Sequence, residues 1–173
     1  METIQIRICQ DTREKSNKKD HILKVFEQHG ISVIRHGLYV GDWTLLNDMS
    51  VCIDTKTGGM LEVYSNLVQD HDRFRRECKR AQDAGIQLVV LVEEKGIASL
   101  DEVRNWINPR AIIRQRKIDN GEDAPKAPPI SSLRLEKIMR VMQENYGVQW
   151  EFCEKAQTGE RILELLGVVN EQS

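Results

Sequence analysis

The run IQLVVLV at 86–92 is the feature that most constrains the fold of this chain. A strand with one face in water alternates apolar and polar residues, whereas a nearly continuous apolar run predicts a strand covered on both faces. Such a strand needs a layer of helices on each side of its sheet. Helical patterns at 70–84 and 131–146 lie on either side of the run in the sequence, so we predict an α/β sandwich with a mixed sheet.

The other segments continue the alternation of strands and helices. They are expected at 3–9 (strand), 18–29 (helix), 31–36 (strand), 61–68 (helix), 99–107 (helix with a Ser99 cap), 148–153 (strand) and from a Thr158 cap to Gly167 (helix). A chain of 173 residues suits one domain, which we expect to span 1–170, with 131–170 as its closing helix, strand and helix. Residues 119–130 hold three of the four prolines and little that can pack, so they predict a mobile loop.

Composition excludes several classes of protein. The formal net charge is −2 and the pI is near 6.1, which argues against a nonspecific nucleic-acid coat protein but not against an enzyme that acts on nucleic acid. The longest apolar run, Leu88 to Val92, is far too short to span a membrane, and the first residues have neither a basic n-region nor an apolar h-region, so no secretory signal is expected. The four cysteines show no zinc-ligand spacing, so we expect reduced core thiols and a cytoplasmic protein. No stretch has the P-loop pattern, and no nucleotide cofactor is expected.

A hairpin in the middle of the chain brings two acidic residues together. A polar turn at 47–49 separates two strand-like runs, and pairing about that turn sets Trp43 opposite Ile53. The same register sets Asp42 opposite Asp54. A slip of one residue would turn the apolar side chains of one strand to the face opposite those of the other, so the apolar pattern selects this register.

The opposed carboxylates predict a cation site at this hairpin. Like charges directly opposed on a sheet destabilise it by up to about 1 kcal/mol, and a bare pair would force one carboxylate to take up a proton. A divalent cation between Asp42 and Asp54 removes that conflict, and oxygen ligands suit Mg²⁺ or Mn²⁺. Lys56 shares their face of the hairpin and can stabilise a developing anion or orient a water. The alternative is a surface hairpin with an ordinary ion pair between Asp54 and Lys56.

Four motifs in chain order resemble the XPF-type structure-specific endonuclease domain of the PD-(D/E)XK nucleases. They are DTRE at 11–14, GDW at 41–43, DTK at 54–56 and HDRFRRE at 71–77, and the apolar run follows them. The segment at 146–167 resembles the closing strand and helix of compact phage and bacterial members of that family.

The resemblance implies a restriction-endonuclease-like three-layer sandwich, in which a mixed central β-sheet with a catalytic hairpin is flanked by helices. It implies a metal-dependent DNA endonuclease that hydrolyses phosphodiester bonds by attack of a metal-activated water, with Mg²⁺ or Mn²⁺ as cofactor. It further implies branched or single-strand/duplex junction DNA as substrate, a homodimer, and a role in DNA recombination or repair in a bacterium or phage-infected cell. Because the family also contains inactive subunits, a catalytically inactive DNA-binding or scaffold module of the same fold is the alternative.

Carried over by position, the resemblance assigns roles to individual side chains. The implied metal ligands are Asp42, Asp54, Asp11 and Glu14, and the implied catalytic lysine is Lys56. Arg13 and Arg73 would support the site or face phosphates. Basic runs at 73–80 and 108–117 add further DNA-binding candidates, which are Arg76, Arg110 and Arg114. For each of these three arginines, a solvated and ion-paired surface is the alternative.

Three positions depart from the family motif. The glutamate of the family is Asp54 here, one methylene shorter, and its central arginine is Thr55. The acid that family members usually carry four residues after the lysine is replaced by Met60, and Glu62 is the nearest acid. These departures bear on how finely the site is positioned.

Overall fold

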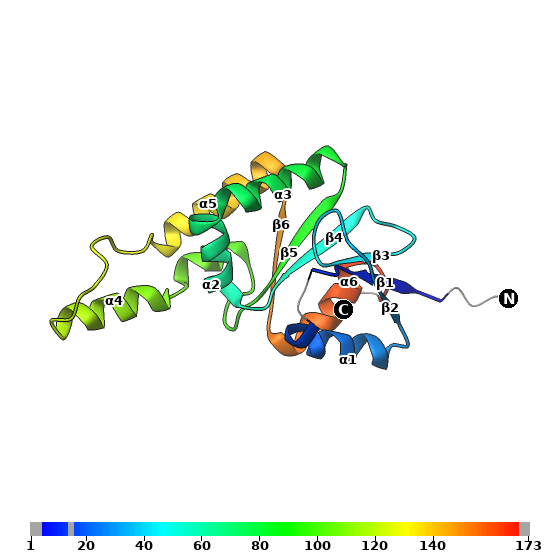
Figure 1. Cartoon of the computed structure of the whole chain (residues 1–173), viewed down its shortest axis with the longest axis horizontal. Helices are drawn as coiled ribbons and strands as arrows, with labels where there is room; N and C mark the ends of the chain where they lie inside the picture. Colours follow the sequence, from blue (N-terminus) through cyan, green and yellow to red (C-terminus); the bar gives the residue numbers. More distant parts are fainter. Residues whose placement is uncertain (1–4, 14–15, 170–173) are drawn as a thin grey trace.

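The computed structural model describes residues 5–13 and 16–169, and its centre is a six-stranded mixed sheet (Figure 1). The strand order is β2-β1-β3-β4-β5-β6. The strands are β1 (Arg7–Gln10), β2 (Ser32–Arg35), β3 (Trp43–Leu45), β4 (Val51–Lys56), β5 (Gln87–Glu93) and β6 (Gln149–Cys153). β3 runs antiparallel to β1 and to β4, and the other neighbouring strands are parallel. The hairpin of β3 and β4 therefore lies in the middle of the sheet.

Helices cover both faces of this sheet, as the apolar run predicts. The helices of one face are α1 (Asp20–Gln28) and α6 (Thr158–Leu165), and those of the other are α2 (Gly59–Tyr64), α3 (His71–Asp83) and α5 (Ser132–Tyr146) (Figure 1). Side chains of β5 alternate between the two layers, because Val89 and Leu91 pack with α1 and α6 whereas Val90 and Val92 pack with α3 and α5. The predicted three-layer α/β sandwich is confirmed.

Further helical segments lie outside these two layers. They are 3₁₀ helices at Ser16–Lys19, Leu100–Asn105 and Lys155–Gln157, a π-helix at Ser65–Gln69, and the helix α4 (Pro109–Asp119). The residues at 108–117 predicted only a basic run, and the helix that they form was missed. In Figure 1 this helix extends away from the sheet, and all eleven of its residues, which the structure describes, remain partly or fully exposed.

Two predicted helix starts differ in detail. Ser99 stands at the N-cap position as predicted, but its side chain makes no cap bond, and the six residues after it form the 3₁₀ helix Leu100–Asn105, a type of helix that suits short segments. Thr158 is the first residue of α6 rather than its cap, and Gln157 takes the cap position. The Thr158 hydroxyl donates to Oε1 of buried Glu93 at 2.7 Å, because a carboxylate is the stronger acceptor within reach.

The predicted loop at 119–130 begins one residue later, since Asp119 ends α4. Residues 120–130 contain neither helix nor strand. Arg114 donates to the carbonyl oxygens of Pro125 at 2.8 Å and Lys126 at 3.0 Å, so the loop folds back along α4. Its mobility stays a prediction, as does the domain boundary at 170, which lies outside the described residues.

The four cysteines are buried and form no disulfide, as predicted for core thiols; they are Cys9, Cys52, Cys78 and Cys153. Burial raises the pKa of each thiol, which keeps all four protonated and weakly reactive near neutral pH. Within residues 5–13 and 16–169, no helix combines the length and apolar character that crossing a membrane requires.

Candidate active site

The hairpin has the predicted register, with Trp43 paired to Ile53 and Thr44 to Cys52. Gly41 allows the chain to enter it, because its φ is +70° and a Cβ there would lie 3.0 Å from the carbonyl oxygen of Ile53. The backbone nitrogen of Asp42 donates to that same oxygen at 2.7 Å. This bond fixes Asp42 just outside the end of β3, at the mouth of the site.

Most of the predicted site residues meet in one cleft of about 540 Å³. The residues that line it include Asp11, Arg13, Asp42, Asp54, Lys56, Arg73 and Arg76. Glu14 lies outside the described residues. Arg110 and Arg114 stand on α4 and do not line this cleft among the described residues.

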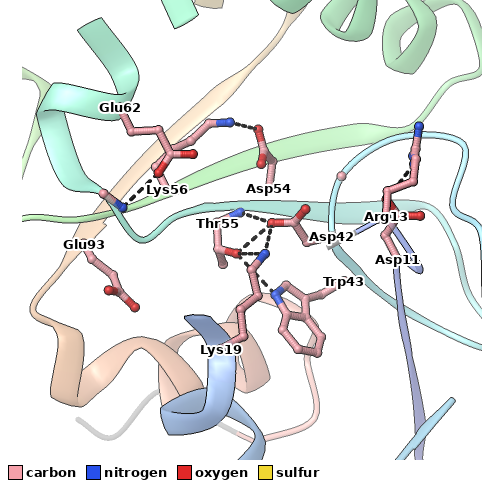
Figure 2. A network of polar contacts seen from close by, with 12 residues as sticks. Asp11, Arg13, Lys19, Asp42, Trp43, Asp54, Thr55, Lys56, Glu62 and Glu93 are labelled. Carbon is pink, nitrogen blue, oxygen red and sulfur yellow. Dashed lines mark hydrogen bonds and ion pairs between the residues drawn. The ribbon is translucent and has the colours of Figure 1, made fainter. Parts of the chain in front are cut away.

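Asp54 and Lys56 form a buried ion pair on one side of β4 (Figure 2). They lie two residues apart on the strand, so their side chains leave the same face, and Nζ of Lys56 is 2.7 Å from Oδ2 of Asp54. Only 8% of the Asp54 side chain and 9% of the Lys56 side chain are exposed. The lysine also lies over the ring of Phe74 in α3, 5.6 Å from its centroid. The pair is therefore removed from water on all but the cleft side.

The two charges of this pair respond to burial in different ways. Burial raises the pKa of Asp54, and the negative charge of Asp42 raises it further, although Lys56 opposes both effects. Burial acts to lower the pKa of Lys56, but the charge of Asp54, followed by those of Glu62 and Asp42, outweighs it and the pKa is raised. Lys56 therefore stays an ammonium ion, and Asp54 is the partner whose charge needs further support.

The carboxylate of Asp42 is placed differently from the prediction. It was expected to share a face with Asp54 and Lys56, yet its Oδ2 accepts hydrogen bonds from the nitrogen of Thr55 at 2.8 Å and from the hydroxyl of Thr55 at 2.7 Å. Figure 2 shows the Thr55 side chain on the side of β4 opposite Asp54. Asp42 precedes β3, so strand alternation does not fix its side chain, and the carboxylate turns to the nearest donors. It still lines the same cleft as Asp54.

Sequence reasoning missed Lys19. Lys19 is only 1% exposed, and its Nζ lies 2.5 Å from Oδ2 of Asp42 and 2.7 Å from the hydroxyl oxygen of Thr55. The ammonium group also lies 5.7 Å from the centroid of the Trp43 ring. A buried lysine contradicts the ordinary distribution of charged residues, so no periodicity could have identified it.

Asp11 is engaged in structural contacts. Its Oδ2 accepts from Nε of Arg13 at 2.7 Å and its Oδ1 accepts from the nitrogen of Leu38 at 3.0 Å. Arg13 also donates to the carbonyl oxygen of Leu38 at 2.8 Å. Asp11 and Arg13 therefore tie the end of β1 to the segment that leads into the hairpin. A direct catalytic role for Asp11 stays a prediction.

Glu62 provides an acidic side chain in the region where the family motif places one. Met60 is fully buried in the core, whereas Glu62 lines the cleft, and its charge is one of those that raise the pKa of Lys56. Oε2 of Glu62 accepts a hydrogen bond from the nitrogen of Gly58 at 2.8 Å, which holds the carboxylate at the start of α2 (Figure 2).

The candidate DNA-binding arginines fall into two groups. Arg73 and Arg76 project from α3 into the cleft, and Arg73 lies 3.7 Å from exposed Asp70. Arg110 instead donates to the hydroxyl of Ser65 at 3.1 Å and lies 5.2 Å from the ring centroid of Tyr64. The Arg110 contacts fasten α4 to the end of α2 and the π-helix, whereas the bonds from Arg114 hold the following loop against α4.

The donor chemistry of the cleft fits a divalent cation. Oδ2 of Asp54 is buried and, among the described residues, has the charge of Lys56 nearby but receives no hydrogen bond of good geometry. No three His, Cys, Asp or Glu side chains of the described residues cluster closely enough to hold a metal by themselves. Mg²⁺ is usually held by one or two carboxylates, with waters and substrate phosphate oxygens as its other ligands. Asp42 and Asp54 meet that requirement in number and type.

Comparisons with known proteins agree with this architecture. The family model of the ERCC4 domain matches residues 10–166. The structure of XPF from Aeropyrum pernix in complex with DNA is 18% identical over 95% of this chain, with a TM-score of 0.60, and the match covers 64% of that chain. A second structure of XPF from Aeropyrum pernix is 17% identical over 96% of this chain, with a TM-score of 0.61, and the match covers 66% of that chain. This chain thus spans just under two thirds of their length. No curated protein sequence matches it.

Proposed function

Because this chain belongs to the ERCC4 domain family, we propose that it is a divalent-metal-dependent DNA endonuclease that hydrolyses phosphodiester bonds. The observation that carries the proposal is the buried pair of Asp54 and Lys56 in a cleft that also holds Asp42. Two charged side chains that are more than nine-tenths buried would be a poor way to stabilise a fold, because desolvation offsets most of their attraction. Their place in an open cleft supports a chemical role.

The residues of the cleft suit the separate tasks of phosphodiester hydrolysis. Asp42 and Asp54 would hold the cation, which when bound neutralises charge on the phosphate and lowers the pKa of a water. Lys56, whose raised pKa keeps it protonated, can donate to a nonbridging or leaving oxygen of the phosphate. Arg73 and Arg76 can contact backbone phosphates on the α3 side of the cleft.

We propose branched or single-strand/duplex junction DNA as the substrate class. The support is membership of the family and the fold shared with XPF from Aeropyrum pernix, one structure of which is a complex with DNA.

We also propose a homodimer. Exposed apolar side chains on α4 and α5 support it, and they are Ile112, Ile113, Ile118, Leu133 and Val141.

The test uses labelled duplex, single-strand, flap and fork oligonucleotides with Mg²⁺ or Mn²⁺. Wild type is compared with Asp54→Asn and Lys56→Ala, and with Lys24→Ala as a control at an exposed position of α1. We expect cation-dependent cutting of a junction substrate by wild type and by the control, and a loss in both cleft variants. Cutting that persists in Asp54→Asn without any cation would contradict the proposal.

The second candidate is a catalytically inactive DNA-binding or scaffold module of the same fold. The observation that favours it is the ion pair of Lys19 with Asp42, because a lysine already supplies positive charge to a proposed cation ligand. Tight binding of one branched substrate by wild type, without cutting under any cation, would establish that function in place of the nuclease.

A further inference from the structure

A buried triangle of polar atoms lies beneath the candidate active site. Its corners are Nζ of Lys19, Oγ1 of Thr55 and Oδ2 of Asp42, and the three separations are 2.5 Å, 2.7 Å and 2.7 Å. Each contact has a proper donor, since the ammonium group donates to both oxygens and the hydroxyl donates to the carboxylate. The three residues are 1%, 4% and 4% exposed, in the same order, so water does not compete for these bonds.

The elements of the triangle come from separate parts of the chain. Lys19 ends a 3₁₀ helix directly before α1, Thr55 belongs to β4 and Asp42 precedes β3. In Figure 2 the Lys19 side chain extends from the α1 side of the sheet towards Thr55 and Asp42, while Lys56 and Asp54 lie on the other side of β4. The active-site strand therefore has a lysine on each face, and only Lys56 is paired with Asp54.

The bonds at Oδ2 limit how Asp42 can bind a cation. This oxygen accepts from Nζ of Lys19, from the backbone nitrogen of Thr55 and from the Thr55 hydroxyl. An ionised carboxylate offers about four lone-pair sites on its two oxygens, so three donors saturate one oxygen. Coordination of a cation by Asp42 is thereby restricted to Oδ1.

We propose that Lys19 is a positioning residue: with Thr55 it fixes the Asp42 carboxylate through Oδ2 and restricts Asp42 to one-oxygen coordination of a divalent cation. The positive charge of Lys19 also repels that cation. The lysine therefore fixes the Asp42 carboxylate but weakens the binding of the cation. Removal of the charge should therefore separate two quantities that usually change together. Cation affinity should rise while the rate of cleavage falls.

The first experiment measures Mn²⁺ binding calorimetrically, without DNA, in wild type, Lys19→Met and Thr55→Val. Lys19→Met removes the charge and keeps most of the buried volume, and Thr55→Val removes the hydroxyl and keeps the charge. Because the repulsion between the lysine charge and the cation is lost, we expect the Kd for Mn²⁺ to fall about tenfold in Lys19→Met. We expect no tightening in Thr55→Val. Lys24→Met, an exposed lysine of α1, controls for the loss of one positive charge.

The second experiment measures cleavage of the preferred oligonucleotide at saturating Mn²⁺. Both Lys19→Met and Thr55→Val should lose about 10–100-fold in rate, the range typical of residues that orient a metal ligand, whereas Lys24→Met should retain the wild-type rate. An unchanged rate in Lys19→Met, or weaker Mn²⁺ binding in that variant, would overturn the inference. If Lys19→Met fails to fold, Thr55→Val decides, because an unchanged rate in that variant is equally contrary.

The expected loss of rate depends on the proposed function, whereas the expected change in Mn²⁺ affinity does not. A wild type that cuts no DNA, together with tighter Mn²⁺ binding in Lys19→Met, would refute the nuclease and support the role of Lys19. If wild type cuts DNA and Lys19→Met has the wild-type Mn²⁺ affinity and cleavage rate, the nuclease is supported and the role of Lys19 is refuted. If wild type cuts no DNA and Lys19→Met binds Mn²⁺ with the wild-type affinity, both the nuclease and the role of Lys19 are refuted.

Discussion

Substitution of Lys56 by methionine should destabilise the fold far more than loss of an exposed ion pair does. Asp54 and Lys56 are 8% and 9% exposed, so removal of the lysine leaves a carboxylate that water cannot solvate. Breaking a buried pair in this way typically costs about 3–5 kcal/mol. The cost at pH 7 should lie near the lower end, about 3 kcal/mol, because Asp54 can take up a proton and so avoid a buried, unpaired charge.

The pH dependence of that cost follows from the direction of the Asp54 pKa. Burial, and then the charge of Asp42, raise this pKa above its ordinary value, and loss of Lys56 removes the main opposing effect. A carboxyl group with a raised folded-state pKa contributes stability below its unfolded pKa and loses that contribution as pH rises through the folded value. The destabilisation by Lys56→Met should therefore shrink as pH falls from 7 to 5, by up to about 1.4 kcal/mol per pH unit.

The assay is urea unfolding in EDTA at pH 7 and pH 5, for Lys56→Met, Asp54→Asn and the double variant. The double variant should recover the loss, because neutral replacements of a buried pair are often neutral or stabilising by about 1–4 kcal/mol. Lys79→Met is the matched control, since its ion pair with Asp83 spans 3.1 Å but is about 60% exposed on both sides. That control should lose less than about 1 kcal/mol. A double variant as unstable as Lys56→Met would refute the reasoning.

Three other changes test separate parts of the structure. Gly159→Ala should destabilise the fold by about 1–3 kcal/mol in thermal or urea unfolding, because its Cβ would lie 2.5 Å from Cβ of Val25, whereas Gly37→Ala, with nothing nearer than 3.9 Å, should be tolerated. The hydrogen bond from Arg104 lowers the pKa of Glu136 despite burial. The ionised Glu136 therefore stabilises the fold above pH 4.5, its ordinary pKa, and this stabilisation is lost as pH falls through the lowered pKa. Glu136→Gln should make the free energy of unfolding less dependent on pH in that range. Mn²⁺ at 100 times its Kd should stabilise wild type by about 2.7 kcal/mol, and calorimetric melting of variants that lack the cleft aspartates should show no such shift.

The sheet and its hairpin could be predicted from sequence because both depend on local patterns. The apolar run at 86–92 required helices on both faces, and the alternation in both strands of the hairpin allowed one register. The pairing of Trp43 with Ile53 follows directly from that register. The position of the Asp42 carboxylate did not follow, since the residue lies outside the strand and its rotamer depends on donors from elsewhere in the chain.

The missed features depend on contacts between distant residues or on signals that compete with one another. Lys19 lies 23 residues from Asp42, and its burial opposes the usual preference of lysine for water. The start of α4 carried a readable signal, because Asn108 caps the helix and Pro109 occupies its first turn. The scattered isoleucines of that helix pack on no core, so its periodicity gave little support.

The weak packing of α4 also bears on how sequences of this kind can diverge. A segment fastened by arginine contacts at Ser65 and Tyr64, with no buried residue of its own, places few demands on its own composition. Substitutions and insertions at 111–130 should therefore accumulate with little penalty to the fold, whereas β4 offers almost no such freedom. Lineages can then alter the outer surface of the molecule while the strand that carries Asp54 and Lys56 stays constant.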